Sequence, residues 1–141
     1  MPPVAGPRGW WEALRWSDDR GDTSIQTAIL FPLVLVVAFA VIQGSMWYYA
    51  MQIAQTAARE GATAARSYQA SPADGSAQAK DVLRRTAGDS LLDYSVSASS
   101  DGQRVRVQVS GTAQSMIPGV SGLRITQVAS GPVERFTVPG E

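Results

Sequence analysis

The chain has 141 residues, 12 basic and 12 acidic side chains, and a net charge of zero. This length suffices for one small domain, and the charge balance provides no basic field for nucleic acid. It contains no cysteine and no histidine, which excludes disulfides, thiolate nucleophiles, histidine bases and the commonest metal ligands. The sequence contains no phosphate-binding loop and no serine-hydrolase motif, so we expect no enzymatic activity, no cofactor and no metal site.

The N-terminal segment, residues 1–21, is rich in Pro, Gly and Trp, and we expect it to be a cytoplasmic leader. A helix is predicted to begin near Thr23. Thr23-Ser24-Ile25-Gln26 fits the S/T-x-x-E/Q capping box, in which the Thr hydroxyl and the Gln amide satisfy backbone N–H groups of the first turn.

An uncharged stretch of 36 residues separates Asp22 from Arg59. As one helix it would measure about 54 Å at ~1.5 Å per residue, whereas a bilayer core needs only about 20 residues. We therefore predict a helix over residues 22–68 that spans a membrane at about 25–49. Pro32 lies inside the span, where a membrane helix tolerates it.

The orientation follows from the flanking arginines. Arg8, Arg15 and Arg20 precede the span, whereas Arg59 and Arg66 follow it. Because positive charge favours the cytoplasmic side, this slim excess predicts a cytoplasmic N-terminus. An aromatic cluster at residues 47–49 is typical of the level where a helix leaves the hydrocarbon. The lipid bilayer is thus the first expected partner.

A ribbon of small residues follows the aromatic cluster. Its members recur at helical spacing: Ala50, Ala54, Ala57, Ala58, Gly61, Ala62 and Ala65. Small side chains allow another helix or a sheet to approach closely. The ribbon is therefore predicted to pack either against the chain's own domain or against a neighbouring subunit, and both can hold.

The remainder, residues 69–141, is predicted to be a small extracytoplasmic α+β domain. A turn-rich linker (69–78) leads to a second helix (76–92), for which Gly88 is a candidate C-cap. Alternating valines on either side of an Asp-Gly turn at 100–103 predict a hairpin. Two further strands are predicted at 123–130 and 133–138, giving a three- to four-stranded antiparallel sheet and a pilin-like α+β fold.

Two other interpretations of the N-terminal region carry less weight. An ordinary signal peptide requires a shorter apolar run, and here the helix continues well past it. The tripeptide Arg20-Gly21-Asp22 matches a cell-adhesion motif, but its predicted place beside the bilayer on the cytoplasmic side does not allow it to reach a receptor on another cell.

Four stretches together resemble a known family: Arg20-Gly21, the apolar run with Pro32, "QTAAREGATAA" (55–65) and "SMIPGVSGLRITQVASG" (115–131). The chain resembles the TadE-like pseudopilins, small membrane subunits of tight-adherence pilus systems. The resemblance implies a structural role in pilus assembly, with other pilin-like subunits and the assembly machinery as partners.

The resemblance also implies a processing site. In the family a prepilin peptidase is expected to cut after the glycine, which here is the bond between Gly21 and Asp22. The family usually has Glu at the fifth mature residue, where this chain has Gln26, and a second Glu near the outer end of the span, where it has Gln43. An amide can hydrogen-bond between helices, worth about 0.6–2 kcal/mol in a membrane, but carries no charge.

Two functions remain open from the sequence. The first is a pseudopilin or minor pilin of a tight-adherence pilus, anchored by its helix, located in the cell membrane or a surface filament, and acting through helix packing. The second is an uncleaved single-pass protein whose extracytoplasmic domain binds a partner or the cell envelope.

Overall fold

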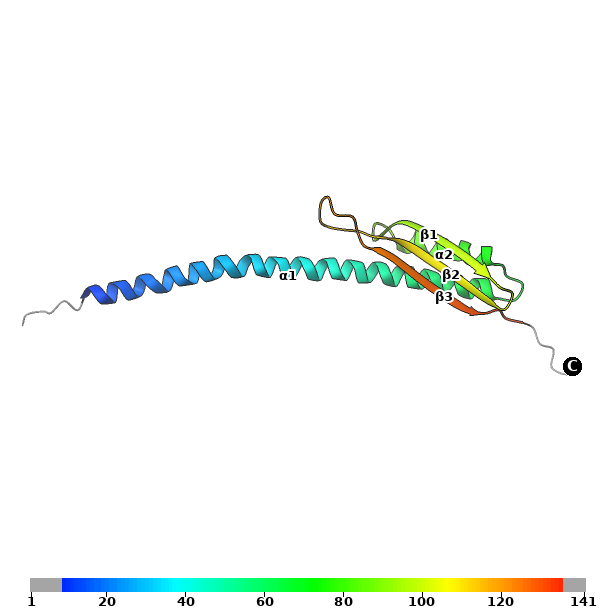
Figure 1. The fold of residues 1–141 in the computed structure, drawn as a ribbon, viewed down its shortest axis with the longest axis horizontal. Coiled ribbons are helices and arrows are strands. Elements are labelled where there is room, and N and C mark those ends of the chain that lie inside the picture. Colours follow the sequence, from blue (N-terminus) through cyan, green and yellow to red (C-terminus); the bar gives the residue numbers. More distant parts are fainter. Residues whose placement is uncertain (1–8, 136–141) are drawn as a thin grey trace, which may run out of the picture. The chain divides into compact units, whose positions relative to one another are not determined.

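The structure, a computed structural model, describes the backbone of residues 9–135 and the side chains of residues 21–135. In this part of the chain the elements are α1 (Gly9–Arg66), α2 (Pro72–Thr86), β1 (Leu91–Ser100), β2 (Arg104–Ala113) and β3 (Arg124–Pro132) (Figure 1). The chain divides into two compact units, Met1–Val41 and Ile42–Glu141. The predicted α+β class, with a long N-terminal apolar helix, a second helix and an antiparallel sheet, is confirmed.

The first helix begins earlier than predicted. α1 starts at Gly9, so the prediction of a helix start and capping box at Thr23 and Gln26 is wrong for the full-length chain. In a continuous helix the N–H groups that such a box would satisfy already bond to carbonyls one turn earlier. Thr27 donates its hydroxyl to the carbonyl oxygen of Thr23 at 2.8 Å, as threonines inside helices do. α1 ends at Arg66, two residues before its predicted end.

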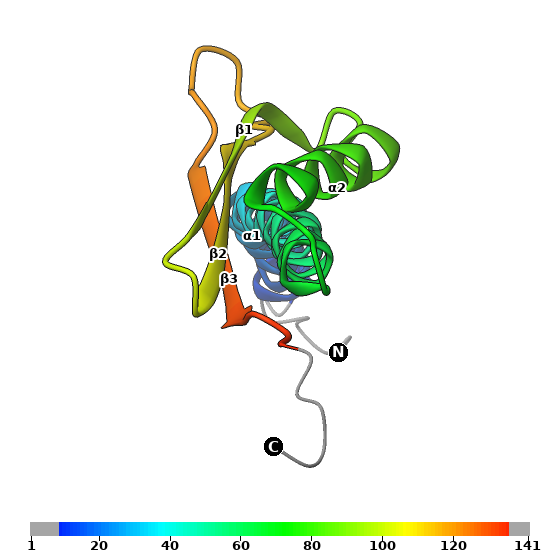
Figure 2. The ribbon, with the colours of Figure 1, turned by 90° about the vertical axis from the view of Figure 1, so that its right-hand side faces the viewer.

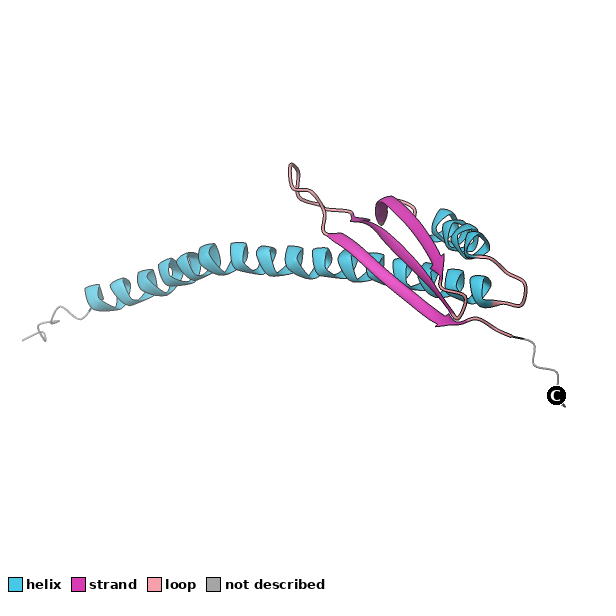
Figure 3. Ribbon diagram, turned by 45° about the vertical axis from the view of Figure 1, so that its right-hand side comes forward, coloured by secondary structure: helices cyan, strands magenta, loops and turns pink. Residues whose placement is uncertain are grey.

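The three strands form one antiparallel sheet in the order β1-β2-β3 (Figure 3). Seen along α1, both the C-terminal part of that helix and α2 lie on the same face of the sheet (Figure 2). β2 is the central strand, and its alternating Val105, Val107 and Val109 are buried, while Arg104, Arg106 and Gln108 are exposed. The sheet is thus apolar toward the helices and polar on its outer face.

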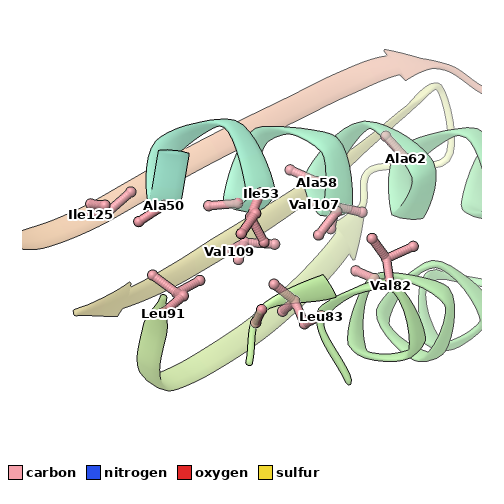
Figure 4. Packing of buried hydrophobic residues seen from close by; sticks show 14 of the residues in the cluster. Ala50, Ile53, Ala58, Ala62, Val82, Leu83, Leu91, Val107, Val109 and Ile125 are labelled. Carbon is pink, nitrogen blue, oxygen red and sulfur yellow. The ribbon is translucent and has the colours of Figure 1, made fainter. Parts of the chain in front are cut away.

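The core lies between the helices and the inner face of the sheet (Figure 4). Its largest fully buried side chains are Leu83 from α2, Leu91 from β1 and the three valines of β2. α1 contributes mainly alanines. Because interiors are close-packed, these short side chains bring the helix backbone near the sheet.

In the C-terminal domain, the second helix and the last predicted strand differ from the sequence prediction, whereas the turn of the hairpin agrees with it. α2 covers Pro72–Thr86 rather than 76–92, because Ser71 starts it earlier and Gly88, with φ +47°, follows its C-cap Ala87. The Asp-Gly turn is confirmed, with Gly102 at φ +85°. The predicted strand at 133–138 is wrong for its described part, because β3 ends at Pro132 and residues 133–135 are not in a strand; residues 136–138 lie outside the described residues.

Candidate functional site: processing junction, membrane span and helix seam

The predicted processing bond lies on an open part of α1. Gly21 and Asp22 are exposed, and a Cβ added to Gly21 would meet nothing within 4 Å. The bond is in helical backbone, so a peptidase must unwind it locally. Glycine lowers the cost of this step, since it is about 0.8–1 kcal/mol less favourable than alanine in a helix. Residues 1–8 of the predicted leader lie outside the described residues, as do the side chains up to residue 20.

The apolar part of α1 is long enough to cross a membrane. Among the described residues one helix, Gly21–Arg66, meets the length and composition that a span requires. Its most apolar 18-residue window is 0% buried in the structure, and large side chains such as Ile29 and Val36 are 69% and 65% exposed. Because so much apolar surface is costly in water, the helix fits a single-pass membrane protein. Pro32 lies within this segment and does not end the helix.

Gln43, near the end of the predicted span, holds the loop between β2 and β3. Its Nε2 donates to the carbonyl oxygen of Gln114 at 3.2 Å, and its Oε1 accepts from the backbone N–H of Met116 at 3.0 Å. An amide can serve both roles at once, whereas an ionised Glu has acceptors alone. The amide at this position is therefore matched to the backbone groups that face it.

A buried seam on α1 begins where the exposed span ends. Ala50, Ala54, Ala57 and Ala58 are 0% exposed, and the other small residues of the ribbon are buried with them: Gly61, Ala62 and Ala65. Their surroundings are the chain's own sheet and α2 (Figure 4). Fully buried side chains offer no surface to a second subunit, so of the two predicted packing partners the structure assigns this seam to the chain's own domain.

Two glycines explain how closely α1 and α2 approach. A Cβ on Gly61 would lie 2.7 Å from the carbonyl oxygen of Gly75 and 2.9 Å from the Cβ of Ala79. A Cβ on Gly75 would lie 2.5 Å from the Cβ of Ala65. All three distances are shorter than real Cβ contacts allow, so the two helices cross at a point where only glycine fits. Gly61 therefore has a packing reason that offsets its poor helix propensity.

Two aspartates fix local turns of the domain. The Asp74 carboxylate accepts hydrogen bonds from the backbone N–H and from the hydroxyl of Ser71. Both bonds lower the pKa of Asp74, the backbone bond more strongly. The backbone N–H of Asp74 in turn donates to the Ser71 hydroxyl. This reciprocal pair is a capping box at the start of α2. In the β1–β2 turn, the backbone N–H groups of Arg104 and Gln103 lower the pKa of Asp101 by bonding its carboxylate.

The outer face of the sheet carries hydroxyl and cationic side chains. Those exposed on alternate positions of the strands are Ser95, Ser97, Ser99, Arg104, Arg106, Arg124, Thr126 and Ser130. The hydroxyls of Ser95 and Ser110 lie 2.8 Å apart across β1 and β2. Apart from Val128, which is 48% exposed on β3, this face is polar and solvated, as expected of a sheet that buries its other side.

Over the described residues, the fold and the one long apolar helix fit a class of protein with a single membrane-spanning helix and a small α+β domain. Comparison with family models shows which known family the chain resembles. The model described as TadE-like protein matches residues 21–63, so the resemblance to the TadE-like family is confirmed over this segment. The match indicates a protein related to the Tad pilus, whose TadE-like members are typically structural. No curated protein and no solved structure matches the chain.

The residues that start α2 carry a capping signal in the sequence, although they lie in the stretch predicted to be a linker. Ser71-Pro72-Ala73-Asp74 has the spacing of a capping box with proline at the first helical position. Gly75 had no such signal, because its role depends on the approach of Gly61 from 14 residues earlier. The contact of Gln43 with the loop likewise joins residues more than 70 positions apart.

Proposed function

We propose that the chain is a pseudopilin or minor pilin subunit of a Tad/Flp-type pilus or a related secretion assembly. The observation that carries this proposal is the extent of the TadE-like match, which starts at Gly21 and ends at residue 63. It begins at the glycine predicted to precede the cut, covers the exposed apolar helix, and reaches the buried seam.

The proposed mechanism divides α1 into two working parts. The exposed part anchors the subunit in the membrane with a cytoplasmic N-terminus, and packs against the corresponding helices of other subunits. The buried seam holds the extracytoplasmic domain on its own helix. Residues 22–42 are thus the surface that other pilin-like subunits meet, since their large apolar side chains are exposed.

Processing would change the start of the helix. A prepilin peptidase that cuts the bond between Gly21 and Asp22 would leave Asp22 as the amino terminus and place Thr23 and Gln26 in the first turn. The N–H groups there would then lose their partners one turn earlier, and the Thr23–Gln26 capping box could form. The side-chain amide oxygen of Gln26 can accept a hydrogen bond from a neighbouring amino terminus but supplies no charge.

The test is the intact mass and N-terminal sequence of the protein purified from native membranes, with and without the prepilin peptidase. Processing predicts a chain that begins at Asp22 when the peptidase is present. Gly21→Ala should block the cut while the protein still folds, because a Cβ at this position meets nothing within 4 Å. Gly44→Ala is the matched control, since Gly44 is equally open.

An N-terminus at Met1 in the presence of the peptidase would remove the trimming step and favour the second function, an uncleaved single-pass protein whose domain binds a partner. The polar, cationic outer face of the sheet supports this second function, since it is open and carries Arg104, Arg106 and Arg124. In that case Gly21→Ala changes neither the size of the protein nor its activity.

A further inference from the structure

The loop between β2 and β3, residues 114–123, exposes an unusual set of side chains. It contains no charged residue, and its four large apolar side chains are each about half exposed: Met116 48%, Ile117 51%, Val120 53% and Leu123 59%. We call it the apolar loop. Contiguous exposed apolar surface of this kind marks a contact site, since water alone does not stabilise it.

Backbone hydrogen bonds close the apolar loop at its base and at its tip. At its base Ala113 donates its N–H to the carbonyl oxygen of Leu123 at 2.9 Å, and a Cβ on Gly122 would overlap the carbonyl oxygen of Ala113. At its tip Val120 donates to the carbonyl oxygen of Ile117 at 3.2 Å.

The tip has the sequence of a type II turn. Pro118 is its second residue and Gly119, at φ +79°, its third, as that turn requires. The turn therefore fixes the backbone positions from which the side chains of Ile117 and Val120 extend.

Gln43 fixes the position of the apolar loop along α1. Its two hydrogen bonds reach the first part of the loop, at Gln114 and Met116. Gln43 lies within the predicted span of 25–49 and four residues before Trp47, which opens the aromatic cluster. At ~1.5 Å per residue, the loop is attached about 6 Å toward the membrane from that cluster.

The charge that follows the loop directly in the sequence fits the same level. Arg124 follows the loop directly, at the first position of β3, and is exposed. On α1 the first charge beyond the span is Arg59, which is about 24 Å from Gln43 at ~1.5 Å per residue, so α1 itself brings no charge to this level. An arginine next to an inserted apolar segment can keep its apolar stem in the interface while its guanidinium binds lipid phosphate.

We propose that the apolar loop is a second membrane contact: it inserts Ile117 and Val120 into the leaflet that the C-terminal end of the span meets, with Gln43 fixing its depth. The domain is then attached to the bilayer at two points, the helix and the loop, which restricts its tilt. This inference goes beyond the proposed function. It needs the span to be in a membrane, but neither cleavage at Gly21 nor assembly into a pilus.

The absence of cysteine allows a direct test in the full-length chain. Ile117→Cys carries a nitroxide spin label in a lipid nanodisc that holds one copy of the protein, with Val120→Cys as a second position. Gln103→Cys, exposed in the β1–β2 turn, is the control. Collision rates are measured with oxygen, which concentrates in lipid, and with a water-soluble nickel chelate.

Insertion predicts that oxygen collisions dominate at residues 117 and 120 and nickel collisions at residue 103. Nickel collisions that dominate at all three positions would overturn the proposal. So would shielding of residues 117 and 120 that appears only when each disc holds two copies, because the loop would then contact a second subunit.

The role of Gln43 is tested in the same labelled background. Gln43→Leu removes both hydrogen bonds to the loop, and Gln43→Glu keeps only the acceptor for Met116. The ratio of oxygen to nickel collisions at residue 117 should fall from Gln to Glu to Leu, while Met46→Leu, one turn away, leaves it unchanged. An equal ratio in all four proteins would show that Gln43 does not set the depth of the loop.

Discussion

Residues 21–49 and residues 50–66 belong to one helix, yet their side chains meet different surroundings. The first segment has large side chains, such as Phe31 and Leu33, that are 63% and 57% exposed. The second has alanines and a glycine, of which four are 0% exposed. Neither segment carries a charge between Asp22 and Arg59, so charge does not separate them. Side-chain size does, because only small residues let a sheet and a second helix approach the backbone.

Three predictions test this contrast, each with a pair of matched substitutions. One substitution of each pair lies in the first segment, and the other lies in the second segment or in the domain that packs on it. Stability is the free energy of unfolding of the domain in detergent, followed by urea titration and circular dichroism.

The largest effect is expected from removing a buried leucine. Leu83 is 0% exposed in the core between α2 and the sheet, so Leu83→Ala should destabilise the domain by about 2–5 kcal/mol through lost burial and a cavity. Leu33→Ala removes the same atoms from an exposed site in the span and should leave the unfolding of the domain unchanged. Equal losses in the two variants would contradict the contrast.

The glycine pair should give a smaller change in stability. The expected change is a loss, whereas helix propensity alone predicts a gain when alanine replaces glycine. Gly61→Ala places a Cβ 2.7 Å from the Gly75 carbonyl oxygen and should cost about 1–3 kcal/mol of overpacking, more than the ~1 kcal/mol that alanine gains in a helix. Gly44→Ala meets nothing within 4 Å and should cause no loss of stability. A stabilised Gly61→Ala variant in urea titration would show that the helices do not cross closely there.

The capping pair should give an effect near 1 kcal/mol. Ser71→Ala removes the hydroxyl that bonds the backbone N–H of Asp74 and should cost about 0.5–2 kcal/mol. Thr23→Ala changes a residue of α1 in the other compact unit and should leave the free energy of unfolding of the domain unchanged in the full-length chain. If the chain is trimmed at Gly21, Thr23→Ala should lower the helicity of the mature form, which circular dichroism can detect.

Acid should destabilise the domain, because it protonates the two aspartates that bond the start of α2 and the β1–β2 turn. Hydrogen bonds lower the pKa of Asp74 and Asp101 in the folded chain below the ordinary 3.8. The unfolded state therefore takes up these protons first as the pH falls. The stabilisation is complete well above pH 3.8 and is lost as the pH falls through the lowered values. Urea midpoints between pH 6 and pH 2.5 should decrease below about pH 4, and Asp74→Asn should flatten that decrease.

The sequence predicted the parts of this protein that depend on local pattern. The uncharged stretch, the alternating valines of β2 and the Asp-Gly turn led to the right classes of element because periodicity and turn chemistry are local. The helix start was missed because a strong capping motif at Thr23 lies inside a longer helix-forming stretch. The strand at 133–138 was wrongly predicted over its described part, residues 133–135, because its pattern is short and β3 ends at Pro132, which cannot donate to a ladder.

The packing of the site depended on contacts that no local pattern encodes. The alanine ribbon was visible in the sequence, but its partner was not, because small side chains suit a sheet, a helix of the same chain and a helix of another subunit equally well. Gln43 was recognised as a departure from the family's acidic residue. Its contact with the backbone of the apolar loop became visible only with the fold.

The most direct test of the two-part helix is a cysteine scan of residues 23–65 in native membranes, which the cysteine-free chain permits. Each variant is reacted with a maleimide that does not cross lipid. We predict continuous protection over about 25–46 on all helix faces, followed beyond residue 50 by protection that recurs every 3–4 residues at the buried seam. A 3–4-residue period that continues through residues 25–46 would contradict the account, because that part of α1 would then pack on protein along one face and meet water on the other.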